Sequence, residues 1–88
     1  MVEVMKFFAP WCGPCHVIEP LISELEKEFY GKININRIDV DKEADMSAKF
    51  GVQSIPTLIF VKNGKEVDRV IEVTSKENLK SKIEKALA

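Results

Sequence analysis

Two cysteines carry the chemistry that this sequence can support. They occur in the segment Trp11-Cys12-Gly13-Pro14-Cys15, and the chain of 88 residues has no other cysteine. A gap of two residues lets the sulfurs approach bonding distance when the segment enters a helix, while the loop they close is too short to stabilise the fold much. The pair is therefore predicted to be a dithiol that opens and closes reversibly.

The two cysteines are expected to have different roles. Cys12 would lie at the start of a helix, where unpaired backbone N–H groups and the helix dipole favour negative charge and hence a thiolate. Cys12 is therefore the candidate nucleophile, and Cys15 is the candidate resolving thiol.

Other chemistries use the same residues. Cys12, Cys15 and His16 together satisfy the Cys-x-x-Cys-His pattern of covalent haem attachment, and they are also possible ligands for zinc or an iron–sulfur cluster. The chain has one histidine and no further cysteine, so a closed metal site lacks partners. We therefore expect neither a metal nor another cofactor, and we interpret His16 as a first-turn residue whose charge can tune the thiols.

Composition narrows the possible partners. The length suits one domain covering residues 1–88, and a net charge of −1 gives no electrostatic footprint for nucleic acid or an anionic membrane. No apolar run is long enough to span a membrane, and the N-terminus does not resemble a secretory signal. These observations favour a monomer located in the cytoplasm. In that compartment a lone Cys-x-x-Cys is more often catalytic or metal-binding than a permanent crosslink.

Hydrophobic patterning predicts seven elements in the order β-α-β-α-β-β-α. Residues 2–8 and 33–40 are expected to be strands, and residues 44–50 a short helix closed by Gly51. Asn63-Gly64 between residues 57–61 and 66–71 predicts an antiparallel hairpin. The result is an α/β domain with a mixed four-stranded sheet and helices on both faces.

The two longer helices are predicted from periodicity and end signals. The first has an apolar face, with Glu19 on the opposite side, Pro20 inside it and an end near Gly31. The last is expected to begin at a capping box formed by Thr74 and Glu77. The apolar positions assigned to the first helix are Val17, Ile18, Leu21, Ile22, Leu25 and Phe29.

The chain resembles the thioredoxin family along essentially its whole length. The resemblance rests on the cysteine motif after the first strand, Phe7-Phe8-Ala9-Pro10 before it, and Ser54-Ile55-Pro56-Thr57 opening the third strand. It implies a thioredoxin fold shortened by the family's N-terminal strand and helix, as in small glutaredoxin-like relatives. The implied strand order is 2-1-3-4, with the first and last helices on one face and the middle helix on the other.

The resemblance also implies an activity. Such a protein would be a thiol-disulfide oxidoreductase that reduces protein disulfides through a mixed disulfide, with a thioredoxin-reductase-like flavoenzyme or glutathione as electron donor. The alternatives are a binding or assembly module that captures a partner without turnover, and a glutathione-linked glutaredoxin-like activity. Pro56 would follow a cis peptide bond, and the implied substrate-binding residues are Trp11, Gly13, Pro14, Ile55 and Pro56.

Two departures from the family pattern bear on tuning. Lys6 occupies the position where many thioredoxins carry a buried carboxylate, and Arg37 matches a position that is often lysine. Both cations could favour a thiolate, but we expect the charged end of Lys6 to reach water while its stem packs on the sheet. Glu72 stands near the position of a glycine that usually borders the substrate groove, and we hypothesise that it disfavours acidic target peptides.

Overall fold

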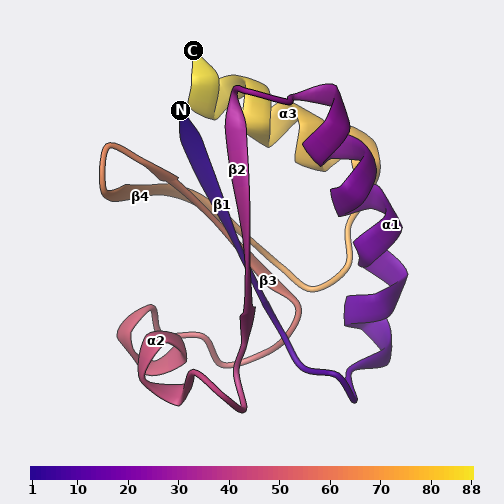
Figure 1. The fold of residues 1–88 in the computed structure, drawn as a ribbon, viewed down its shortest axis with the longest axis vertical. Helices are drawn as coiled ribbons and strands as arrows, with labels where there is room; N and C mark the ends of the chain where they lie inside the picture. Colours follow the sequence, from indigo (N-terminus) through magenta and orange to yellow (C-terminus); the bar gives the residue numbers. More distant parts are fainter.

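A four-stranded mixed sheet forms the centre of the protein (Figure 1). The computed structural model describes all of residues 1–88. The elements in chain order are β1 Val2–Phe8, α1 Gly13–Glu28, β2 Ile33–Asp39, α2 Ala44–Lys49, β3 Thr57–Lys62, β4 Lys65–Ile71 and α3 Lys76–Leu87. The sheet order is β2-β1-β3-β4, with β1 and β2 parallel and the other pairs antiparallel. The predicted element order and strand order are confirmed.

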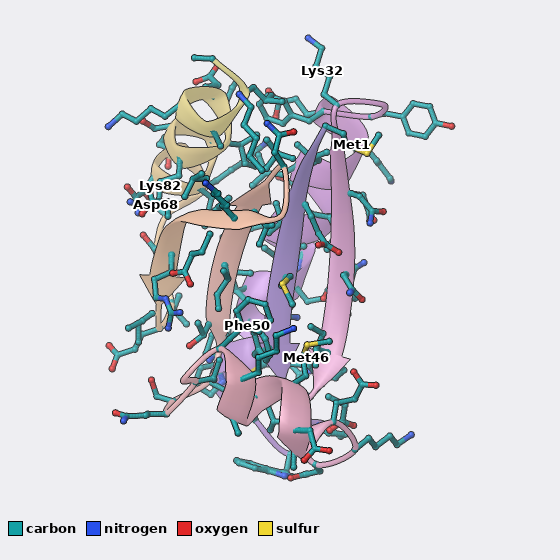
Figure 2. The ribbon with its side chains drawn as sticks, turned by 90° about the vertical axis from the view of Figure 1, so that its left-hand side faces the viewer. Met1, Lys32, Met46, Phe50, Asp68 and Lys82 are labelled. Carbon is teal, nitrogen blue, oxygen red and sulfur yellow. A yellow bond between two sulfur atoms is a disulfide. The ribbon has the colours of Figure 1, made fainter.

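Alternation along the central strand separates two apolar layers. Val2 and Val4 of β1 belong to the larger core, which the sheet forms with α1 and α3 on one face. Met5 and Phe7 point to the other face, where α2 covers a smaller cluster. Figure 2 shows Phe50 between α2 and the sheet, and its ring centroid lies 6.0 Å from that of Phe7. The predicted distribution of helices over the two faces is therefore confirmed.

The turn between β3 and β4 fits the predicted hairpin. Asn63 and Gly64 both have positive φ angles, of 54° and 79°. Two such residues in succession make the type I′ geometry whose twist matches that of antiparallel strands. Gly64 and Asn63 are suited to this geometry, because glycine has no Cβ and asparagine tolerates the left-handed region.

The structure corrects two details of the helix predictions. Ser75, not Thr74, is the N-cap of α3, and its side chain accepts a hydrogen bond from the backbone N–H of Asn78 at 3.1 Å. Both residue types can cap a helix, so the pattern left the start uncertain by one residue. The predicted apolar face of α1 includes Val17, but this side chain is 65% exposed.

None of the helices is both long and apolar enough to cross a membrane.

Ile18 should be among the residues that fix α1 to the sheet. Its side chain is fully buried in the core shared by the sheet, α1 and α3. We predict that Ile18→Ala lowers the free energy of unfolding by about 2–4 kcal/mol, because it removes buried methyl groups and leaves a cavity. Urea denaturation measures this change.

Val17→Ala provides the control on the neighbouring, exposed position. It should change the free energy of unfolding by no more than about 0.5 kcal/mol. Equal losses for the two variants would contradict the helix orientation.

Candidate active site

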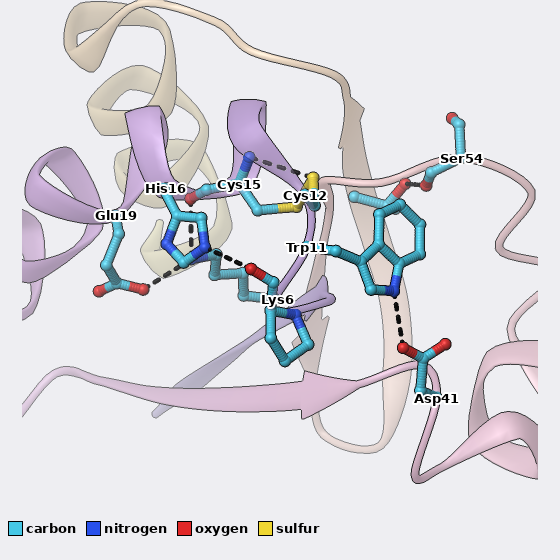
Figure 3. The surroundings of a disulfide bond; sticks show 10 residues. Lys6, Trp11, Cys12, Cys15, His16, Glu19, Asp41 and Ser54 are labelled. Carbon is cyan, nitrogen blue, oxygen red and sulfur yellow. Dashed lines mark hydrogen bonds and ion pairs between the residues drawn. A yellow bond between two sulfur atoms is a disulfide. The ribbon is translucent and has the colours of Figure 1, made fainter.

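The cysteine pair lies where β1 ends and α1 begins. Cys12 is the N-cap of α1, Gly13 and Pro14 form its first turn, and Cys12 Sγ accepts a hydrogen bond from the backbone N–H of Cys15 at 3.2 Å (Figure 3). The two cysteines are joined by a disulfide with their Cα atoms 5.3 Å apart. Cys12 therefore lies at the N-terminus of a helix, as expected for the candidate nucleophile, and a backbone N–H group of the first turn points at its sulfur.

Both sulfur-bearing residues are enclosed by apolar neighbours. Cys12 and Cys15 are buried and pack with Ala9. The site lies beyond the carboxyl end of β1, which runs parallel to β2 and is central in the sheet. Open α/β sheets generally place their ligand sites at this end of the strands.

Trp11 lies on the surface beside the disulfide. Its side chain is 71% exposed, although large apolar side chains are usually covered. The indole N–H donates a hydrogen bond to the Oδ2 atom of Asp41 at 2.8 Å (Figure 3). This contact holds the ring while leaving most of its surface exposed to solvent.

Ile55 and Pro56 precede β3 and border the site. Ile55 packs against the cluster that contains the disulfide, and the peptide bond between Ile55 and Pro56 is cis, as predicted. The carbonyl oxygen of Pro56 accepts a hydrogen bond from the backbone N–H of Glu72 at 2.9 Å. This bond connects the segment before β3 to the residue that follows β4.

Lys6 is buried, so the expectation that its charged end reaches water is wrong. The residue is only 3% exposed. Its Nζ atom donates to Glu19 Oε1 at 2.6 Å and to the carbonyl oxygen of Cys15 at 3.2 Å, and it lies 5.5 Å from the ring centroid of Phe8. The physical reason is strand alternation, which places Lys6 on the sheet face that α1 covers. A carboxylate on α1 meets the ammonium group there.

Glu19 forms ion pairs with both Lys6 and Arg37. Arg37 is the partner of Lys6 in the register of β2 and β1, and its Nη2 atom lies 2.8 Å from Glu19 Oε2. Burial alone would raise the pKa of Glu19, but hydrogen bonds from Arg37 and Lys6 and their charges outweigh it and lower the pKa from 4.5 to about 2. Hydrogen bonding to Glu19 in turn raises the pKa of Arg37 further above its usual range.

Glu19 is the site residue that the sequence interpretation missed. That interpretation places it on the solvent side of α1, yet it lies one helical turn beyond Cys15 and therefore on the same side of the helix. That spacing was the available signal. A small hollow of about 150 Å³ lies beside Cys15 and is lined by Lys6, Phe8, Cys15, His16, Glu19 and Arg37.

His16 has a local partner. Its Nε2 atom lies 2.7 Å from the carbonyl oxygen of Pro10 (Figure 3). No group of three or more His, Cys, Asp or Glu side chains is arranged to hold a metal ion. The zinc interpretation of Cys12, Cys15 and His16 therefore finds no additional ligand in the fold.

Comparison with known proteins agrees with this geometry. The sequence model described as Thioredoxin matches residues 2–85. The chain belongs to the thioredoxin family. It is 49% identical over 86 residues to a thioredoxin of Staphylococcus saprophyticus, covering 98% of this chain and 83% of that protein. It is 45% identical over 82 residues to the chloroplastic M-type thioredoxin of Pisum sativum, covering 93% of this chain and 48% of that protein.

A solved thioredoxin has the same fold. A single-residue mutant of a thioredoxin from Halobacterium salinarum superposes with a TM-score of 0.91 at 31% identity, over 99% of this chain and 75% of that one. Family membership and the bonded cysteine pair make this protein a thiol-disulfide oxidoreductase of the thioredoxin type.

Loss of the Glu19 charge should destabilise the folded protein in a pH-dependent way. The folded-state pKa of about 2 lies below the usual 4.5, so the stabilisation is complete well above pH 4.5 and is lost as the pH falls toward 2. Glu19→Gln should lower the free energy of unfolding at pH 7 by about 1–2 kcal/mol, because it leaves Lys6 buried without a counterion, with solvent screening reducing the effect. Denaturation at pH 7 and at pH 3 should show the deficit shrinking at the lower pH.

Two further variants test the assignment. Glu26→Gln removes the other carboxylate of Arg37, which lies farther away at 3.3 Å and is more exposed, and it should cost no more than about 0.5 kcal/mol. In a Lys6→Met background, Glu19→Gln should cost less than it does alone. A deficit independent of both pH and Lys6 would contradict the proposed ion pair.

Proposed function

We propose that this protein reduces disulfides in other proteins, with Cys12 as the nucleophile and Cys15 as the resolving thiol. The observation that carries the proposal is the N-cap position of Cys12, whose sulfur accepts a hydrogen bond from the first turn of α1. The same N–H group and the helix dipole favour a thiolate when the pair is reduced. Thiolates, rather than thiols, attack disulfides.

The proposed cycle has two exchange steps. Cys12 thiolate attacks one sulfur of the target disulfide, the target S–S bond breaks, and the other target sulfur leaves as a thiolate that takes up a proton. Cys15 then loses its proton and attacks Cys12 Sγ, which forms the Cys12–Cys15 disulfide and releases the second target thiol. The target gains two electrons from the cysteine pair. Of the two protons that it gains, one is released by Cys15 and the other comes from solvent, because Cys12 reacts as a thiolate. The bonded pair seen here corresponds to the oxidised end of this cycle.

The target is proposed to lie along Ile55 and Pro56 as an extended segment beside Trp11. The exposed indole supplies apolar contact area, and Gly13 and Pro14 in the first turn of α1 are also exposed. A Cβ atom built on Gly13 would meet no other atom within 4 Å, so the space directly beside Gly13 is open. The proposed contact residues are Trp11, Gly13, Pro14, Ile55 and Pro56.

An external donor is proposed to return the pair to the dithiol. The two candidate donors are a thioredoxin-reductase-like flavoenzyme and glutathione, and recycling assays with each identify which one serves. We propose that the protein carries out this reduction in the cytoplasm, as a monomer. The support for this compartment is that both cysteines of the chain lie in one Cys-x-x-Cys pair, which in a cytoplasmic protein is more often catalytic or metal-binding than a permanent crosslink.

Trapping distinguishes the roles of the two sulfurs. Cys15→Ser removes the resolving thiol, so the protein should accumulate as a covalent adduct with a disulfide substrate, visible by non-reducing electrophoresis and intact mass. Reduction of the substrate should fall by at least about 100-fold, because the second exchange step is missing.

Cys12→Ser is the matched variant. It should form no adduct through Cys15 and should have no reductase activity. Adduct formation by Cys12→Ser at the rate of Cys15→Ser would reverse the assignment of nucleophile and resolving thiol.

A further inference from the structure

Glu72 occupies an unusual backbone position at the edge of the site. Its φ angle is +73°, and Asn63 in the hairpin turn is the only other non-glycine residue with a positive φ. Residues with a Cβ atom rarely adopt this conformation, and long side chains such as glutamate have no local hydrogen bonding that favours it. Asn63 is explained by its turn, but Glu72 is not. Backbone outliers of this kind are found disproportionately at functional sites.

The side chain of Glu72 borders the proposed path of the target. An open hollow of about 350 Å³ lies beside the first turn of α1 and is lined by Pro14, Ile55, Pro56, Glu72 and Val73. Glu72 is exposed and forms no ion pair within the chain. It is the only charged residue among those lining residues. The hollow therefore combines an apolar surface with one unpaired carboxylate.

The other side of the same path is also free of positive charge. A second hollow, of about 170 Å³, shares Ile55 with the first and is lined otherwise by uncharged residues that include Trp11. The indole of Trp11 is held by the carboxylate of Asp41. The nearby cations, Lys6 and Arg37, line a separate hollow and are paired with Glu19. A chain lying along Ile55 and Pro56 thus passes the carboxylate of Glu72 on one side and a hollow with no charged lining residue on the other.

We propose that Glu72 makes this site selective for target segments that carry lysine or arginine beside the reactive cysteine. The inference rests on the proposed reductase function and adds the chemical class of its substrates. A basic side chain in the first hollow would place its cation at Glu72 and its aliphatic stem against Pro14 and Val73. An acidic side chain there would meet like charge, which opposes both encounter and binding.

Single-turnover reduction of paired peptides tests the inference. The pre-reduced protein is mixed with two disulfide peptides that differ only in having lysine or glutamate on both sides of one cysteine. At low ionic strength the second-order rate constant for the basic peptide should exceed that for the acidic peptide by about fivefold, as expected for one exposed attraction and one exposed repulsion. Addition of about 0.5 M salt should bring the ratio close to one, because salt screens exposed charges.

Three variants assign the preference to Glu72. Glu72→Gln and Glu72→Gly should each at least halve the ratio, and the glycine variant accommodates the positive φ without a side chain. Glu3→Gln makes the same change of net charge near the start of β1, at the opposite end of the sheet from the cysteines, and should leave the ratio unchanged. A wild-type ratio near one, or an unchanged ratio in both Glu72 variants, overturns the inference alone. Failure of the reduced protein to react with either peptide overturns the proposed function itself.

Discussion

A buried ammonium group needs a negative partner, and that requirement organises the end of the sheet where the chemistry lies. Lys6 is on the central strand, and the face to which it points is covered by α1. Its charge is met by Glu19 from α1, and Glu19 also binds Arg37 from β2. One carboxylate thereby ties three elements together within one helical turn of Cys15. The helix that carries the cysteine pair is held to the sheet by charge here and by apolar packing farther along.

This arrangement places one carboxylate and two cations beside Cys15, with the carboxylate on the helix and the cations on two strands. Many thioredoxins carry a buried carboxylate at this position of the strand, where this chain has Lys6. The carboxylate is supplied from the helix, and the network as a whole has one more positive than negative charge when only Lys6, Arg37 and Glu19 are counted. Since Lys6 also donates to the carbonyl oxygen of Cys15, any change in the network reaches the backbone of that cysteine directly.

Much of the fold could be predicted from the sequence, because its signals are local. Alternation marked the strands, Asn63-Gly64 marked the hairpin, and the spacing of Cys12 and Cys15 marked the dithiol. The cis bond before Pro56 could be predicted only from the family resemblance, since nothing in the local sequence favours it over the trans form. Glu19 was missed because its partner lies on a strand, and a long-range ion pair has no periodicity of its own. The positive φ of Glu72 was likewise invisible, because glutamate gives no signal for that conformation.

The Cys12–Cys15 pair is proposed to catalyse disulfide exchange and not merely to capture a partner. A turnover assay tests this. The protein is mixed with an excess of a protein disulfide and a recycling dithiol, and the moles of disulfide reduced per mole of protein are measured. The amount reduced in the same time with the Cys12→Ser variant is subtracted as background. Each mole of protein should reduce many moles of disulfide, and free protein should be recovered at the end. Reduction that stops at one equivalent, with the protein left covalently joined to its partner, would contradict it.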